Sequence, residues 1–210
     1  MSRAFLATYR PLCGSPQGRA AIARHAIPPY VDASCRREPD LEARWPTISA
    51  LCRGANFAPR LRPGDRVAYM TTIQHGAWRL SALLEVKERF ETHKEAKAWH
   101  EARGLALPSN CMTRGNRPIP LDRTDGCGGC HSSRELAQRD AVYAERALRF
   151  GVMLLCKPLF IQLHSPPVIS REDWIAWNGR VPVTRTPPQI SERLWDRLTH
   201  LGYDCRKRTR

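Results

Sequence analysis

A chain of 210 residues has the length of one large domain or two small ones, enough to bury a core without disulfides or oligomerisation. Hydrophobic residues make up 42% and charged residues 26%, which excludes wholesale disorder, and no apolar run reaches the roughly 20 residues of a membrane span. Lys and Arg number 34 against 20 Asp and Glu, a net charge of +14. Because such a field attracts polyanions, DNA or RNA is the expected partner, and a membrane is not.

The first half of the chain predicts strands with one early helix. Alternating residues at 4–9 predict a strand, 16–26 a short helix ended by two prolines, and 48–52 a short strand. A Pro-Gly turn at 61–65 precedes strands at 66–72 and 78–90, which a hairpin loop at 74–77 would pair antiparallel at the centre of a sheet.

The second half predicts three capped helices and a broken strand. Thr92, Ser132 and Ser170 are each followed three residues later by an acid, which predicts helix starts there, the first two helices running to about 103 and 150. Residues 152–156 and 159–163 read as strand interrupted by Pro158, and a last helix is expected from 191 to about 201. The whole chain, 1–210, reads as a single α+β domain with an irregular insertion at about 105–131.

The N-terminal stretch carries too short an apolar run for a signal-peptide core, so we expect a cytoplasmic protein whose eight Cys are reduced. The positive charge is distributed, with +6 in 1–70, +2 in 71–130 and +6 in 131–210. Arg supplies 29 of the 34 basic residues, which suits bidentate phosphate and guanine contacts, although a GC-rich genome raises Arg in the same way. The oligomeric state stays open.

The densest polar cluster is the loop 32–40, DASCRREPD. Arg36 and Arg37 there are candidates for a phosphate clamp, and Ser34 and Glu38 for hydrogen bonds to a base. The alternative is a loop that neutralises itself through salt bridges. Aromatic rings near this loop could stack on an extruded base, and Trp45 is favoured because it lies where a loop meets a strand.

The motif CGGCH at 127–131 matches the haem-attachment pattern, but haem attachment normally accompanies export, which we do not expect here, and the motif occurs once, so haem is not favoured. Cys127 and Cys130, with His131 or Cys111, could instead hold a structural zinc. The spacing is half a zinc signature, so a turn with free thiols is the stronger expectation, and no cofactor is expected.

Catalytic signals are weak, because the sequence contains no dinucleotide-binding, Walker, HExxH or GxSxG motif. An enzyme acting on nucleotides or nucleic acid, with Cys35, Asp32 or Glu38 at its centre, is the alternative to a binding protein. A third reading is a small zinc-stabilised interaction protein.

The stretches LRPGDRVAYMT (61–71) and WRLSALLEV (78–86) resemble the core hairpin of the PUA-like superfamily, which includes EVE, YTH and ASCH domains. With the loop 32–40 and the stretch NCMTRGNRPIP (110–120), the chain is similar to the nucleotide modification-associated domains of bacteria and phages.

This resemblance implies a twisted, barrel-like mixed β-sheet flanked by helices, and a protein that reads a modified, flipped base in restriction or phage defence. The residues that would form the base-binding cage of such a fold are Trp45, Ser49, Tyr69 and Thr71. The flanking phosphates would be bound by the guanidinium groups of Arg36, Arg37, Arg53 and Arg60.

Overall fold

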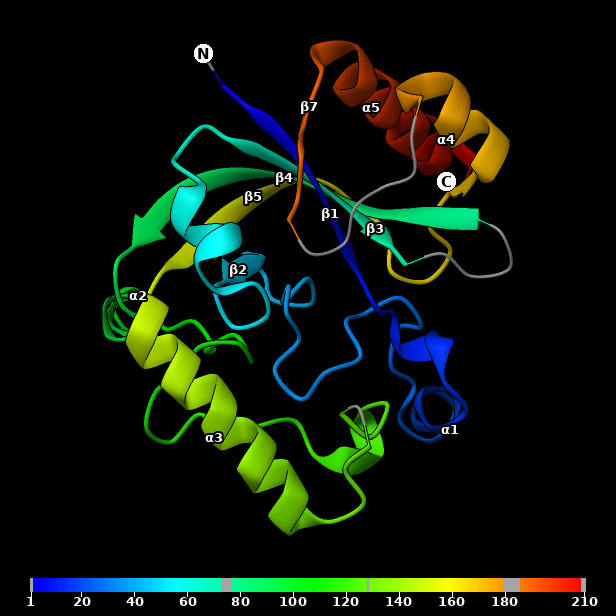
Figure 1. Ribbon diagram of the computed structural model, residues 1–210. Helices are drawn as coiled ribbons and strands as arrows, with labels where there is room; N and C mark the ends of the chain where they lie inside the picture. Colours follow the sequence, from blue (N-terminus) through cyan, green and yellow to red (C-terminus); the bar gives the residue numbers. More distant parts are fainter. Residues whose placement is uncertain (1, 73–76, 128, 180–185, 209–210) are drawn as a thin grey trace.

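The structure, a computed structural model, describes residues 2–72, 77–127, 129–179 and 186–208. A twisted sheet forms its centre; helices α4 and α5 lie on one side of it, and α1, α3 and long loops lie on the other (Figure 1). The strands are β1 (Ala4–Tyr9), β2 (Thr47–Ser49), β3 (Arg66–Thr71), β4 (Ala77–Phe90), β5 (Met153–Ile161), β6 (Val168–Ser170) and β7 (Gln189–Ile190). The helices are α1 (Pro16–His25), α2 (His93–Glu101), α3 (Ser133–Phe150), α4 (Arg171–Asn178) and α5 (Glu192–Arg208).

The seven strands form one mixed sheet in the order β2-β5-β4-β3-β1-β7, with β6 paired to the first residues of β4. Among the strands that the structure describes, only β1 and β3 run parallel; every other pair, including the expected β3–β4 pair at the centre, is antiparallel. The outer strands β2 and β7 do not pair with each other among the described residues, so the sheet is open. The expected mixed α+β architecture is confirmed, whereas the described strands do not close into a barrel.

Both faces of the sheet are buried, which explains why the alternation in the first strand is imperfect. Phe5, Ala7 and Tyr9 of β1 contribute to the core beneath the long loops, while Ala4 and Leu6 pack towards α4 and α5. A strand covered on both sides has no solvent face that would require polar residues at every second position.

Local sequence signals set the helix starts as expected. The Ser132 hydroxyl accepts from the backbone N–H of Glu135, whose carboxylate accepts from the Ser132 N–H, which completes a capping box. The Thr92 and Ser170 hydroxyls likewise accept backbone N–H bonds at the starts of α2 and α4.

The structure differs from several of these expectations. Strand β5 continues through Pro158. Its pairing with β2 ends at Leu155, so at Pro158 the strand that pairs with it in the described part of the chain is β4, on one side. The short strands β6 and β7 were not expected, and α5 extends to Arg208. The predicted hairpin loop falls mostly on residues 74–76, which lie outside the described residues.

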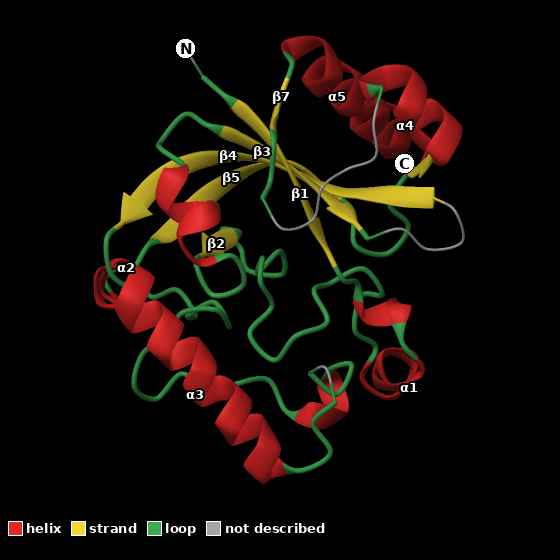
Figure 2. Ribbon diagram, viewed as in Figure 1, coloured by secondary structure: helices red, strands yellow, loops and turns green. Residues whose placement is uncertain are grey.

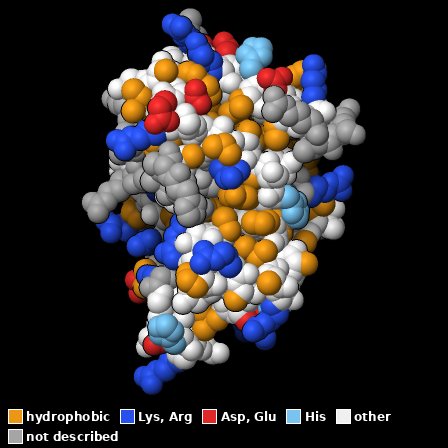
Figure 3. Space-filling view, turned by 90° about the vertical axis from the view of Figure 1, so that its right-hand side faces the viewer, with side chains coloured by type: hydrophobic (Ala, Val, Ile, Leu, Met, Phe, Trp, Pro, Cys, Tyr) orange, Lys and Arg blue, Asp and Glu red, His pale blue; other side chains and the backbone are white. Residues whose placement is uncertain are grey.

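The segments 26–46 and 102–132 contain little regular structure (Figure 2), as expected for the second. Apolar side chains gather at the centre of the face seen in Figure 3, and Lys and Arg surround them at separate points. On this face the positive charge is therefore spread over the surface.

Candidate functional site

The loop that carries Trp45 is closed at its base. Asp40 and Thr47 exchange two backbone hydrogen bonds of 3.0 Å, and one Asp40 carboxylate oxygen accepts the N–H groups of Glu42 and Ala43 at 3.1 and 3.2 Å. An acceptor that captures the N–H groups that follow it in the chain is the usual way in which Asp stabilises a turn. The loop 41–46 therefore projects from a fixed base, with Trp45 near its end.

The opposite wall is the segment after α2. The other Asp40 oxygen accepts from both the backbone N–H and the hydroxyl of Ser109 at 2.7 Å, which ties the two segments together. Asn116 donates to the carbonyls of Pro108 and Cys111 at 2.9 and 2.7 Å and closes the turn between them. His100, in the last turn of α2, completes the floor.

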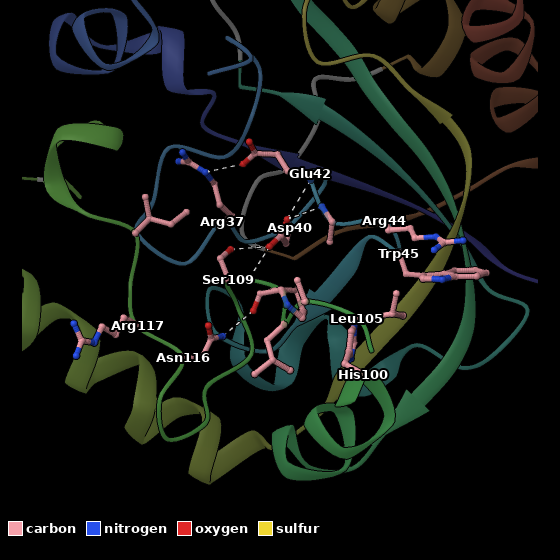
Figure 4. A pocket seen from close by; sticks show the side chains of 15 residues that line it. Arg37, Asp40, Glu42, Arg44, Trp45, His100, Leu105, Ser109, Asn116 and Arg117 are labelled. Atoms are coloured by element: carbon pink, nitrogen blue, oxygen red, sulfur yellow. Dashed lines mark hydrogen bonds and ion pairs between the residues drawn. The ribbon is translucent and has the colours of Figure 1, made fainter. Parts of the chain in front are cut away.

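Between these walls lies a pocket of about 480 Å³. Figure 4 shows Arg44 and Trp45 side by side at one end of the pocket, Arg117 at the other end, and Asp40 with Ser109 between them. The volume is within the range of small-molecule sites, which is roughly 300–1,000 Å³. The pocket combines one large aromatic ring with polar groups from three parts of the chain.

The free charge of this pocket is positive. The carboxylate of Glu42 pairs with Arg37 at 3.1 Å, and that of Asp40 is occupied by four internal donors. Arg44 and Arg117 are exposed, and among the described residues neither has a hydrogen-bond or ion-pair partner. Both guanidinium groups are therefore available to an anionic ligand.

Of the residues expected to form a base-binding cage, the structure brings only Trp45 to the pocket wall. Tyr69 is fully buried in the core, where its ring meets those of Tyr9 and Phe57 edge-on at 6.1 and 6.4 Å. Thr71 is also buried, and its hydroxyl accepts the backbone N–H of Arg79. These side chains stabilise the sheet and do not face the pocket.

Ser49 and Glu38 form a second buried group behind the Trp45 loop. The Glu38 carboxyl group accepts from the backbone N–H of Ser49 at 3.0 Å and from the side-chain amide of Asn110 at 3.0 Å, and the Ser49 hydroxyl also bonds to it. Burial raises the pKa of Glu38 to about 8, so this carboxyl group is largely protonated at neutral pH. Ser34 donates to Asp32 and is only partly buried.

The four arginines expected to bind phosphate lie in different places. Arg36 is 2% exposed and forms a bidentate ion pair with Asp140 of α3 at 2.6 and 2.7 Å. Arg37 is equally buried, donates to backbone carbonyls and reaches the pocket only beside Glu42. Arg53 bonds to the Thr8 carbonyl and lies over the Phe57 ring, while Arg60 is exposed. Thus the Arg pair in the loop 32–40 points into the protein. This arrangement is closer to the alternative expectation, a loop that neutralises itself through salt bridges, than to a phosphate clamp.

The possible zinc ligands do not converge. Cys127 and Cys130 lie in one small cluster, whereas Cys111 belongs to another, where its thiol bonds to the carbonyl of His93 at 3.5 Å. Across residues 2–72, 77–127, 129–179 and 186–208, no three His, Cys, Asp or Glu side chains are placed to hold a metal ion.

The residues of the alternative catalytic centre are occupied by internal contacts. Asp32 accepts the N–H groups of Ser34 and Glu38 at 2.9 and 3.1 Å, and burial raises its pKa. Cys35 is fully buried beside Cys127. These groups organise the loop 32–40 from within.

Sequence reasoning missed Arg44, Arg117 and His100 as pocket residues. Arg44 and Arg117 could have been found, because Arg44 precedes the favoured Trp45 and Arg117 lies in the stretch 110–120 already singled out. His100 carried no signal, since a His on a helix is usually part of the core.

No helix in the described part of the chain has the length and apolarity of a membrane span. Comparison with known proteins finds no matching family model, no matching curated protein and no matching solved structure.

Proposed function

We propose that this protein binds DNA or RNA and holds one unstacked base, carrying a modification, against Trp45. The observation that carries the proposal is one pocket that combines a partly exposed indole with two guanidinium groups that have no partner among the described residues, in a chain of net charge +14. The sheet would then be an open relative of the PUA-like fold.

The indole ring supplies the stacking surface. Stacking on an aromatic side chain contributes about 1–3 kcal/mol per base, and it requires a ring that no neighbouring side chain already covers on both sides. Trp45 is only partly buried, at the end of a loop whose base is fixed by Asp40 and Thr47. A ring held in this way loses little freedom when a base binds.

The polar groups of the pocket fit a nucleotide better than a neutral metabolite. Arg44 and Arg117 lie at opposite ends of the pocket, so a base near Trp45 would leave its flanking phosphates within the reach of guanidinium groups. Ser109 and His100 lie between them and could bond to the edge of the base.

The test is fluorescence anisotropy with single-stranded and duplex oligonucleotides, each unmodified or carrying one methylated base, from roughly 50 to 200 mM salt. Trp45→Ala should weaken binding by about 1–3 kcal/mol, and Trp45→Phe should retain most of it, because Phe keeps a stacking face. Arg44→Ala with Arg117→Ala should reduce the slope of log Kd against log salt by about 2.

The matched control replaces Arg171 and Arg193, exposed residues of α4 and α5 on the other face of the sheet. It changes the net charge equally and should leave the slope nearly unchanged if the phosphates lie at the pocket. If the control pair lowers the slope as much as the pocket pair, or if Trp45→Ala binds as the wild type does, the proposed site is wrong. Equal affinity for modified and unmodified oligonucleotides would remove the modified base from the proposal.

A further inference from the structure

Three thiols meet in one small cluster away from the Trp45 pocket. Cys35 of the loop 32–40 and Cys127 are both buried, at 0% and 6% exposure, and pack with Leu136 of α3. Cys130 lies against the same cluster and is less buried. The cluster joins segments that are far apart in the sequence, so a covalent bond within it would cross-link the fold.

The two segments are already held side by side by their backbones. The N–H of Ile119 donates to the Cys35 carbonyl at 2.9 Å, and that of Asp125 donates to the Ala33 carbonyl at 3.2 Å. From α3, Arg139 donates twice to the Cys127 carbonyl, at 3.0 and 2.8 Å. Cys127 itself has φ +48°, a conformation uncommon for residues other than Gly.

Cys35 and Cys127 are neighbours in this cluster, and the Cys35 thiol is the largest influence that lowers the pKa of Cys127. Thr124 lowers the pKa of Cys127 further, while the neighbouring Cys127 and burial raise the pKa of Cys35. A thiolate is the form of cysteine that attacks an oxidant, and a second thiol beside it is in place to close a disulfide.

A second cavity lies beside this cluster and is lined by its Cys130. It has a volume of about 280 Å³ and lies between α1 and the turn that contains Cys127. Thr124, Gly126 and Cys130, which flank Cys127 in the chain, all line it, as does Arg24 of α1. A hydroperoxide is small enough to enter such a space.

We propose that Cys35 and Cys127 form a peroxide-reactive dithiol site. The Cys127 thiolate attacks one peroxide oxygen, the O–O bond breaks, and the departing alkoxide or hydroxide takes a proton and leaves as alcohol or water. The resulting Cys127 sulfenic acid is attacked by the Cys35 sulfur, an S–S bond forms, and the second oxygen leaves as water with the Cys35 proton. Two electrons pass from the thiols to the peroxide.

The test treats the reduced full-length protein with equimolar hydrogen peroxide, blocks the remaining thiols with N-ethylmaleimide and maps tryptic peptides without reduction. Cleavage after Arg isolates Cys35 in the peptide 25–36, and Cys127 with Cys130 in the peptide 124–134. We expect these two peptides to become cross-linked as the main product, with the loss of two hydrogen atoms from the intact mass.

Variants separate the alternatives. Cys130→Ser should keep the cross-link, Cys127→Ser should lose it, and Cys52→Ser, which removes an exposed thiol elsewhere, should not affect it. A disulfide within the peptide 124–134, or a cross-link that Cys130→Ser abolishes, would overturn the assignment to Cys127. Oxidation that stops at sulfinic acid without a cross-link would also overturn it. Wild type and Cys130→Ser both keep the buried pair, so the result does not depend on whether Cys127→Ser folds.

Discussion

Glu38→Gln should remove a pH dependence from the stability of this protein. Glu38 is 3% exposed, and burial raises its pKa from 4.5 to about 8. Between these two values the unfolded chain has released the Glu38 proton and the folded chain still binds it. Ionisation then favours the unfolded state, so stability falls as pH rises through this interval and levels off above about pH 8.

The magnitude follows from the two pKa values. Each pKa unit corresponds to about 1.4 kcal/mol, so the Glu38 contribution to the free energy of unfolding should fall by about 3–4 kcal/mol from about pH 5 to about pH 8. Gln has a similar shape and no titration. The difference in stability between variant and wild type should therefore grow by that amount in favour of the variant as pH rises.

The assay is urea unfolding followed by tryptophan fluorescence at several pH values in this range, applied to wild type, Glu38→Gln and Glu38→Asp. The Asp variant keeps an ionisable group and should keep a pH-dependent stability. If the wild-type and Gln curves run parallel across the range, Glu38 is ionised in the folded protein and the reasoning from its burial fails.

Two further predictions concern other buried groups. Asp140→Asn leaves the buried guanidinium of Arg36 without its carboxylate and should lower the free energy of unfolding, measured with urea, by about 2–4 kcal/mol. The control Glu145→Gln, an exposed change on the same helix, should lower it by less than about 0.5 kcal/mol. Equal losses in the two variants would show that the ion pair adds nothing to stability. The alkylation rate of Cys127, followed by mass spectrometry, should rise with pH around a midpoint below that of an ordinary thiol. Cys35→Ala should move that midpoint upward, since it removes the neighbour that lowers the pKa of Cys127; an unchanged midpoint would assign the shift to another cause.

The elements of this fold could largely be predicted, because their signals are local. A hydroxyl and an acid three residues apart were sufficient to place the start of α3, and the central β3–β4 pair followed from two neighbouring strands. The short strands β6 and β7 have only three and two residues, too few for a periodic pattern, and depend on pairing with β4 and β1.

The interior of the candidate site could not be predicted, because its contacts are long-range. An exposed phosphate clamp and a buried ion pair look the same in the sequence at Arg36, whose partner Asp140 is 104 residues away. Trp45 was correctly expected at a loop-to-strand junction, and the structure shows that this residue lines the pocket. That Trp45 stacks on a base stays a prediction.

The bonds of Arg36 have a consequence for any attempt to shorten the chain. Every residue that lines the Trp45 pocket precedes residue 120, so a fragment ending at 131 would contain the whole pocket in sequence. Yet Arg36 donates at once to the carbonyls of Ser109 and Asn116 on the pocket wall and to Asp140 on α3. Such a truncation would lose the carboxylate that neutralises this guanidinium, and the pocket is therefore not a separable module.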